Sequence, residues 1–155
     1  MTDVVLFEEI ICNNDKKIGV ATLNSPKSLN ALSGDMIDLL YPQLQAWHED
    51  KAIAAVMLQG AGEKALCAGG DIVKLYNDMK EADGDFSPSI ESYFTREYQL
   101  DYLIHTYSKP FIVWGHGIVM GGGLGLMVGA SHRVVTESSR IAMPEISIGL
   151  YPDVG

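Results

Sequence analysis

Residues 111–126 read FIVWGHGIVMGGGLGL, and no other stretch of the chain points as strongly to a fold class. The run Phe111–Trp114 has the continuous apolar composition of a strand that is buried on both faces. The glycine-rich segment Gly115–Gly125 follows it and opens a helix that we expect to reach about Ser131. A buried strand that passes through glycines into a helix is typical of α/β proteins with parallel strands.

The same order of features occurs earlier in the chain. Ile53–Gln59 is a second continuous apolar run, and Leu66–Gly70 leads into a helix that begins near Asp71. The other expected elements are strands at Val4–Ile11, Lys17–Leu23, Arg133–Thr136 and Arg140–Met143, helices at Asp35–Asp50 and Ile90–Tyr107, and a break at Asp83–Ser89. This order predicts a single α/β unit without internal repeats.

The composition excludes several classes of protein. The chain has 155 residues, 47% of them hydrophobic, which suits one globular domain or part of a larger one. Its net charge of −9 disfavours a nucleic-acid partner. The apolar runs are too short to span a membrane, and residues 1–11 lack the basic segment of a secretory signal. We therefore expect no membrane partner and a cytoplasmic location.

Cysteine and histidine offer no metal or disulfide framework. Cys12 and Cys67 are too few for a disulfide scaffold, and the four histidines do not have the spacing of metal ligands. Cys67 stands beside a glycine pair, but no histidine is near it in the sequence, so we interpret it as a packing residue. No metal site is predicted.

Two glycine clusters, Gly69-Gly70 and Gly121–Gly123, each follow a predicted strand and precede a helix. The start of a helix offers free backbone N–H groups and the positive end of the helix dipole. Phosphate-binding spacings fail, because the third glycine of G-x-G-x-x-G is replaced by Met120 or by Leu126, and G-x-x-x-x-G-K-[ST] is absent. An oxyanion hole built from two loops fits the pattern. Close packing of helix on strand is the alternative, and the spacing alone leaves both open.

Four blocks of sequence together identify a family resemblance. They are SPKSLNAL at 25–32, ALCAGGDI at 65–72, GIVMGGGLGL at 117–126 and MPEISIGLYPDVG at 143–155. In content, order and separation they resemble the crotonase, or enoyl-CoA hydratase/isomerase, superfamily. The segments AGGD at 68–71, FTREYQL at 94–100 and GLYPDVG at 149–155 are most similar to its 3-hydroxyisobutyryl-CoA hydrolase branch.

The resemblance implies a fold and a partner. It implies an α/β spiral of β-β-α units and an acyl-coenzyme A thioester as the small-molecule substrate. Residues 1–155 would be the N-terminal core portion, the C-terminal helical part would be lacking, and the full-length protein would be a homo-oligomer. Coenzyme A belongs to the substrate, so no separate cofactor is expected.

The resemblance also implies roles for particular residues. The N–H groups of Gly70 and Gly122 would form the oxyanion hole, and Glu145 and Asp153, eight residues apart, would be catalytic. Glu145 would act as nucleophile or general base, and Asp153 would orient the substrate hydroxyl or a water. Glu97 would contact the substrate.

Four further positions of the sequence matter to the resemblance. Ala68, Asp71 and Ile72 would line the adenine pocket, and Asp71 is also well placed to cap the helix that follows it. Enoyl-CoA hydratases have a second glutamate where this chain has Gly125. Because a glycine is neither acid nor base, hydration of a double bond is disfavoured.

The sequence therefore predicts hydrolysis of a short-chain hydroxyacyl-CoA thioester, with 3-hydroxyisobutyryl-CoA of valine catabolism as the implied substrate. Two alternatives remain. One is an enoyl-CoA hydratase or isomerase on the same fold, since an isomerase needs only one carboxylate. The other is a non-catalytic CoA-binding module.

Overall fold

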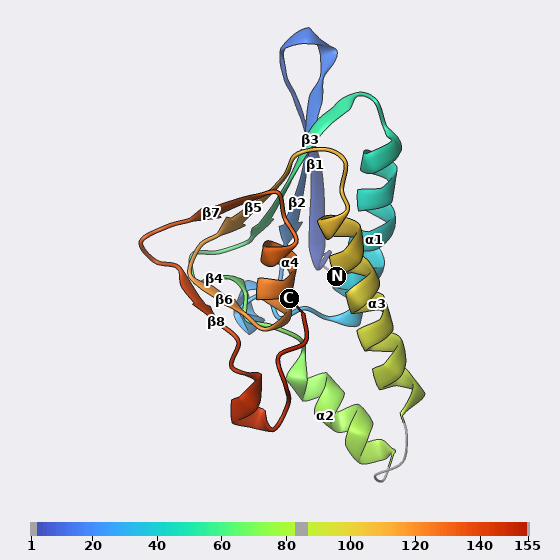
Figure 1. Cartoon of the computed structure of the whole chain (residues 1–155), viewed down its shortest axis with the longest axis vertical. Coiled ribbons are helices and arrows are strands. Elements are labelled where there is room, and N and C mark those ends of the chain that lie inside the picture. Colours follow the sequence, from blue (N-terminus) through green and yellow to red (C-terminus); the bar gives the residue numbers. More distant parts are fainter. Residues whose placement is uncertain (1–2, 83–86, 155) are drawn as a thin grey trace.

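From Ile53 onward, successive strands of the chain alternate between two sheets in the computed structural model, which describes residues 3–82 and 87–154 (Figure 1). The larger sheet has the strand order β1-β2-β3-β5-β7 and the smaller sheet the order β4-β6-β8. The strands of the larger sheet are β1 (Val5–Ile11), β2 (Lys17–Leu23), β3 (Ile53–Gly60), β5 (Phe111–Gly115) and β7 (His132–Val135). Those of the smaller sheet are β4 (Ala65–Cys67), β6 (Ile118–Met120) and β8 (Arg140–Ala142).

This alternation makes a spiral. β3, β5 and β7 lie side by side and parallel in one sheet, while β4, β6 and β8, which follow each of them in the chain, are parallel neighbours in the other. Helices follow β4 and β6, so the first two turns of the spiral are β-β-α units, whereas β8 is followed by a short 3-10 turn. The predicted spiral of an α/β protein is thus confirmed, and the antiparallel β1–β2 hairpin extends its larger sheet.

Within residues 3–82 and 87–154, four α-helices accompany the sheets: α1 (Gly34–Glu49), α2 (Ile72–Glu81), α3 (Pro88–His105) and α4 (Gly122–Val128). α1 and α3 pack against each other on one side of the sheets (Figure 1). The apolar positions of α1 recur at helical spacing and are buried, namely Met36, Ile37, Leu40, Leu44 and Trp47. The hydroxyl of Ser33 accepts a hydrogen bond from the N–H of Met36 and caps this helix. None of the helices within the described residues combines the length and apolarity that a membrane span needs.

The short strands of the smaller sheet are the main difference from the sequence-based prediction. β4 and β6 have three residues each, and we expected only connections into helices there. Three residues carry too little periodicity to be recognised, and these strands exist because their parallel neighbours in the spiral supply hydrogen bonds. The predicted break at Asp83–Ser89 falls partly outside the described residues, and α3 begins at Pro88. The tail after Pro144 contains a short 3-10 turn, η3 (Glu145–Ile148).

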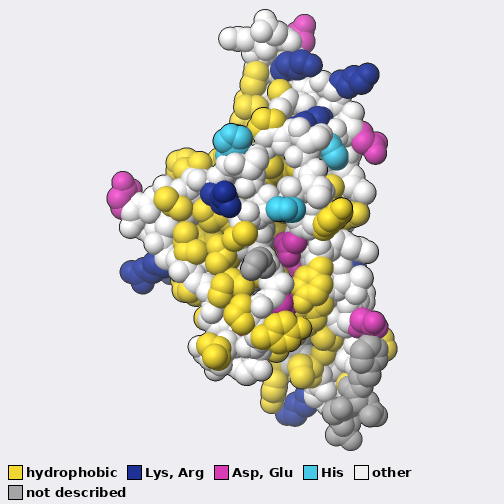
Figure 2. All heavy atoms as spheres, viewed as in Figure 1, with side chains coloured by type: hydrophobic (Ala, Val, Ile, Leu, Met, Phe, Trp, Pro, Cys, Tyr) yellow, Lys and Arg dark blue, Asp and Glu magenta, His cyan; other side chains and the backbone are white. Residues whose placement is uncertain are grey.

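Hydrophobic side chains are spread over the central and lower part of the face drawn in Figure 2. Large exposed apolar residues come from α2 (Val73, Tyr76, Met79) and from the tail (Ile146, Ile148, Leu150, Tyr151). Apolar surface on this scale is typical of interaction sites. It is consistent with the expected association of the protein, which stays a prediction.

Candidate active site

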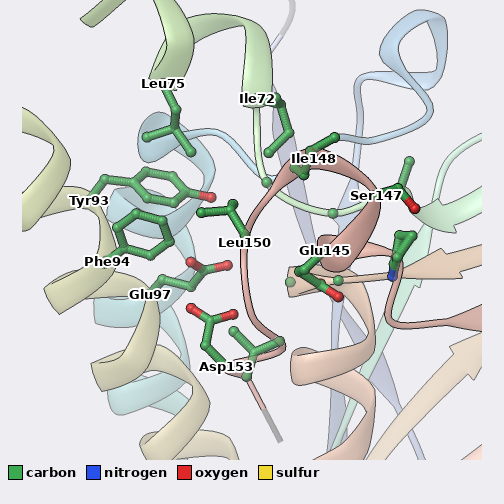
Figure 3. A pocket seen from close by; sticks show the side chains of 17 residues that line it. Ile72, Leu75, Tyr93, Phe94, Glu97, Glu145, Ser147, Ile148, Leu150 and Asp153 are labelled. Carbon is green, nitrogen blue, oxygen red and sulfur yellow. The ribbon is translucent and has the colours of Figure 1, made fainter. Parts of the chain in front are cut away.

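A cavity of about 240 Å³ lies where the loop after β4, α2, α3, the start of α4 and the tail meet. Figure 3 shows Tyr93, Phe94 and Glu97 of α3 on one side of it, facing Glu145 and Ser147 on the other. Seven of the eight predicted site residues line this cavity: Ala68, Gly70, Ile72, Glu97, Gly122, Glu145 and Asp153. Residues spread over half the chain are therefore brought to one place.

Asp71 is the predicted residue that lies elsewhere. Its Oδ1 accepts a hydrogen bond of 3.1 Å from the N–H of Lys74, so it caps α2 as the sequence suggested. It lines a neighbouring cavity of about 190 Å³ between α2 and α3, together with Lys74 and Arg96. The structure thus gives Asp71 a capping role and places it outside the wall of the main cavity.

Two glycines that line the cavity, Gly70 and Gly122, have backbone N–H groups without an acceptor among the described residues. Leu32 brackets Gly70: its N–H donates to Gly69 O over 2.7 Å, and its carbonyl accepts from Asp71 N–H over 3.1 Å. The N–H of Gly70 therefore faces away from Leu32. Gly122 is the first residue of α4, so its N–H has no partner in the helix. Neither N–H donates to any acceptor within residues 3–82 and 87–154.

The two groups are neighbours. A Cβ added to Gly122 would lie 3.6 Å from Gly70 N and 2.3 Å from Glu97 Oε1. Gly121, just before it, has a φ of +48°, and a Cβ there would lie 2.7 Å from Glu145 Oε1. The carboxyl oxygens of Glu97 and Glu145 therefore lie directly against these two glycines, in the space that a side chain there would need. Two converging N–H donors suit an oxygen that gathers negative charge.

Three carboxyl groups surround the donors. Glu97 is only 2% exposed and Glu145 is 8% exposed, and Oε2 of Glu145 is buried with no hydrogen-bond partner in the described part of the chain. Asp153 comes from the tail, beside Glu97 (Figure 3), and accepts a hydrogen bond at Oδ2 from the Tyr98 hydroxyl. Burial, followed by the nearby carboxylates of Asp101 and Asp153, raises the pKa of Glu97 to about 8.

The tail also explains why Gly125 is a glycine. A Cβ at this position would lie 2.6 Å from Val154 Cβ and 2.9 Å from Val154 O. The space that a hydratase glutamate would need is therefore filled by the segment that carries Asp153. Packing of the tail on α4 therefore both fills the space beside Gly125 and holds Asp153 at the cavity.

Cys67 lies in the hydrophobic core. It is fully buried, and burial raises the pKa of its thiol to about 12. A thiol that keeps its proton is a poor nucleophile, so its interpretation as a packing residue is confirmed. Among the described residues, no three His, Cys, Asp or Glu side chains are grouped so as to hold a metal ion.

The sequence-based prediction missed Tyr98 and Asp101. Asp101 lies one helical turn after Glu97 on α3, and both of its oxygens are buried without a hydrogen-bond partner in the described residues. Its pKa is raised to about 7, chiefly by burial and then by Asp153. The spacing of four between Glu97 and Asp101 was the available signal, because it places both on one side of a helix.

The spiral and its cavity place the chain in the crotonase fold class. A crystal structure described as a carnitinyl-CoA dehydratase from Mycobacterium thermoresistibile superposes with a TM-score of 0.87 at 38% identity, covering 99% of this chain and 42% of that one. The sequence profile described as enoyl-CoA hydratase/isomerase matches residues 18–155. The chain therefore belongs to the enoyl-CoA hydratase/isomerase family.

Two curated relatives match almost the whole of this chain. The 3-hydroxyisobutyryl-CoA hydrolase, mitochondrial, of Danio rerio is 48% identical over 97% of this chain. The small ribosomal subunit protein mS47 of Neurospora crassa is 40% identical over 96% of it. The chain spans 37% of the length of the first relative and 29% of the second.

The comparison corrects one prediction. A cytoplasmic location is contradicted, because the Danio rerio relative is named as a mitochondrial protein. A low cysteine count argues only against an oxidising, secreted setting. It does not separate the cytoplasm from the interior of a mitochondrion.

Proposed function

We propose that the protein hydrolyses a short-chain hydroxyacyl-CoA thioester, with 3-hydroxyisobutyryl-CoA as the substrate. The observation that carries the proposal is the pair of acceptor-free N–H groups of Gly70 and Gly122, beside Glu145, in one cavity. The name of the Danio rerio relative supports the acyl group and a mitochondrial location.

The proposed reaction uses the two N–H groups as an oxyanion hole. The thioester carbonyl oxygen accepts hydrogen bonds from Gly70 and Gly122, and either Glu145 or a water activated by Glu145 attacks the carbonyl carbon. Attack by Glu145 gives a mixed anhydride that water then cleaves, whereas attack by water needs a single addition. In both routes the C–S bond breaks, CoA leaves as a thiolate that takes up a proton, and the acid product carries oxygen from water.

The remaining cavity residues fit the rest of the substrate. Asp153 orients the hydroxyl of the acyl group or the attacking water, and Glu97 contacts the substrate from α3. Leu75, Phe94 and Leu150 add apolar walls, and a cavity of about 240 Å³ suits a small branched acyl group. Ala68 and Ile72 lie at the rim toward α2, where the adenine of CoA would pack. This chemistry uses no metal or redox cofactor.

Two other functions have a specific observation in their favour. The superposition on a carnitinyl-CoA dehydratase favours hydratase or isomerase chemistry, although the packing of Val154 on Gly125 disfavours a second glutamate. The 40% identity to a ribosomal subunit protein favours a non-catalytic role in an assembly. The free donors and buried carboxyl groups argue for catalysis over that role.

The test compares two products. Full-length protein is incubated with 3-hydroxyisobutyryl-CoA and free thiol is measured with a chromogenic reagent, while loss of enoyl absorbance is followed with crotonyl-CoA. We expect thiol release without enoyl loss, and loss of thiol release in Glu145→Gln but not in Glu137→Gln, an exposed carboxylate outside the cavity. Enoyl loss without thiol release would establish the hydratase or isomerase. Neither reaction, with CoA still bound, would favour the assembly role.

A further inference from the structure

Three carboxyl groups, those of Glu97, Asp101 and Asp153, lie close together between α3 and the tail. Glu97 and Asp153 line the cavity, and Asp101 and Asp153 line a neighbouring groove of about 360 Å³. Asp153 is thus the wall shared by the two spaces. No Lys or Arg belongs to the described lining of either one. Such a cluster cannot ionise fully at neutral pH, because each negative charge disfavours the next.

Hydrogen bonding distinguishes the three groups. Asp153 receives a hydrogen bond from the hydroxyl of Tyr98. Both oxygens of Asp101 are buried without a partner among the described residues, and Glu97 is only 2% exposed. A donor stabilises the ionised form of the carboxyl group that it reaches. Among the three groups, Asp153 is therefore the one whose ionised form the Tyr98 hydroxyl stabilises.

The position of Glu97 makes its protonation state important for the proposed catalysis. Its Oε1 lies 2.3 Å from the position that a Gly122 Cβ would occupy, and so borders the two free N–H groups. An ionised Glu97 would repel the oxyanion that forms there. A protonated Glu97 would not repel it and could add an O–H donor.

We propose that Tyr98 is a positioning residue that holds Asp153 as the ionised member of the cluster, and so leaves Glu97 protonated as a hydrogen-bond donor beside the oxyanion hole. This inference rests on the proposed hydrolase function. The raised pKa of Glu97, about 8, agrees with the geometry.

Other titratable groups also lie around the cluster. They are Tyr93, Tyr102 and His105 from α3, Cys67 from β4, and Glu145 and Tyr151 from the tail. His105, which lines the same groove as Asp101 and Asp153, is the one basic side chain among them. α4, whose sequence is GGLGLMV, has no titratable side chain, and Asp38 of α1 is paired with Arg96. Tyr98 is accordingly the described group that gives Asp153 a donor.

The test compares Tyr98→Phe with Tyr102→Phe in the full-length protein. Tyr102 lies one turn later on the same helix, its side chain is 70% exposed, and its hydroxyl has no partner among the described residues. The readout is the pH profile of kcat/KM for thiol release. A hydrogen bond to a charged group changes an equilibrium roughly 10- to 100-fold, so Tyr98→Phe should move the acid limb up by about one to two pH units. Tyr102→Phe should match the wild type.

A second readout does not depend on turnover. Carbon-13 NMR of labelled Glu and Asp carboxyl groups reports the protonation of each group near pH 7, with the Glu97 signal assigned from Glu97→Gln. We expect a protonated Glu97 in the wild type and partial transfer of its proton to Asp153 in Tyr98→Phe. An ionised Glu97 in the wild type, or a uniform loss of rate without a shift of the profile, would overturn the inference. Absence of thiol release in the wild type would instead contradict the proposed function.

Discussion

Gly122→Ala should abolish most of the activity while leaving the protein folded. The new methyl carbon would lie 2.3 Å from Glu97 Oε1 and 3.6 Å from Gly70 N, in the space that a carbonyl oxygen must enter to reach both donors. Removing one oxyanion-hole donor costs roughly 10²–10³ in kcat, or about 2.7–4 kcal/mol of barrier. The methyl group denies the substrate both donors, so we expect a loss at the upper end of that range or beyond.

The effect on stability should be much smaller. Replacing a helical glycine by alanine raises the free energy of unfolding by about 1 kcal/mol, and forcing an extra methyl group into a tightly packed site lowers it by about 1–3 kcal/mol. These contributions oppose each other, and the end of the Glu97 side chain can turn aside. The melting temperature of Gly122→Ala should therefore stay close to that of the wild type.

The assay is thiol release by full-length protein at saturating substrate, with thermal unfolding followed by circular dichroism. Gly34→Ala is the matched control, because Gly34 is also the first residue of a helix and its Cβ would meet only the mobile end of Arg96, at 3.2 Å. We expect wild-type rates from this control. A folded Gly122→Ala that turns over within a few-fold of the wild type would refute the oxyanion-hole geometry.

Three further predictions concern the framework, the tail and pH. The fully buried side chain of Asn30 donates to Ala61 O and Ala65 O and accepts from the N–H of Ser25. Asn30→Ala should therefore lower the free energy of unfolding by about 2–4 kcal/mol in urea titrations. A decrease of less than about 1 kcal/mol would contradict this prediction. Gly125→Glu should displace Val154 and the tail, so this variant should no longer release thiol and should not hydrate crotonyl-CoA either. Hydration of crotonyl-CoA by the variant would show that the space beside residue 125 can hold a glutamate. The pKa of Glu97 rises from 4.5 to about 8 in the folded protein, so its contribution to stability is complete below pH 4.5 and is lost as the pH rises through 8. Between pH 4.5 and 8 the melting temperature should fall less steeply in Glu97→Gln than in the wild type, and the exposed Glu91→Gln should behave like the wild type. The same slope in the wild type and in both variants would contradict this prediction.

Much of the fold could be predicted from the sequence, because its longer elements have strong periodicity. The helix around Met36–Trp47 and the strand at Ile53–Gly60 were found within a residue or two of their observed bounds. The strands β4 and β6 of the smaller sheet were not, since three-residue strands depend on neighbours that are distant in sequence, whereas β8 was expected at Arg140–Met143. Asn30 escaped notice for the same reason: its partners at Ala61 and Ala65 follow it by more than thirty residues.

For the site, the resemblance supplied the residues and the structure supplied their arrangement. Gly70, Gly122 and Glu145 were predicted, but only the fold shows that their groups converge on one cavity. The acidic environment of Glu97 could not be predicted, because it combines Asp101 from the same helix with Asp153 from the tail. The roles of these residues, the homo-oligomer and the extent of the core at residues 1–155 stay predictions.

The most direct test of the central claim is a crystal structure of full-length Glu145→Gln protein soaked with 3-hydroxyisobutyryl-CoA. The account predicts the thioester carbonyl oxygen at about 2.7–3.1 Å from both Gly70 N and Gly122 N, with residue 145 facing the carbonyl carbon. A substrate whose carbonyl oxygen contacts neither glycine, or whose acyl group lies outside the cavity between α3 and the tail, would contradict it.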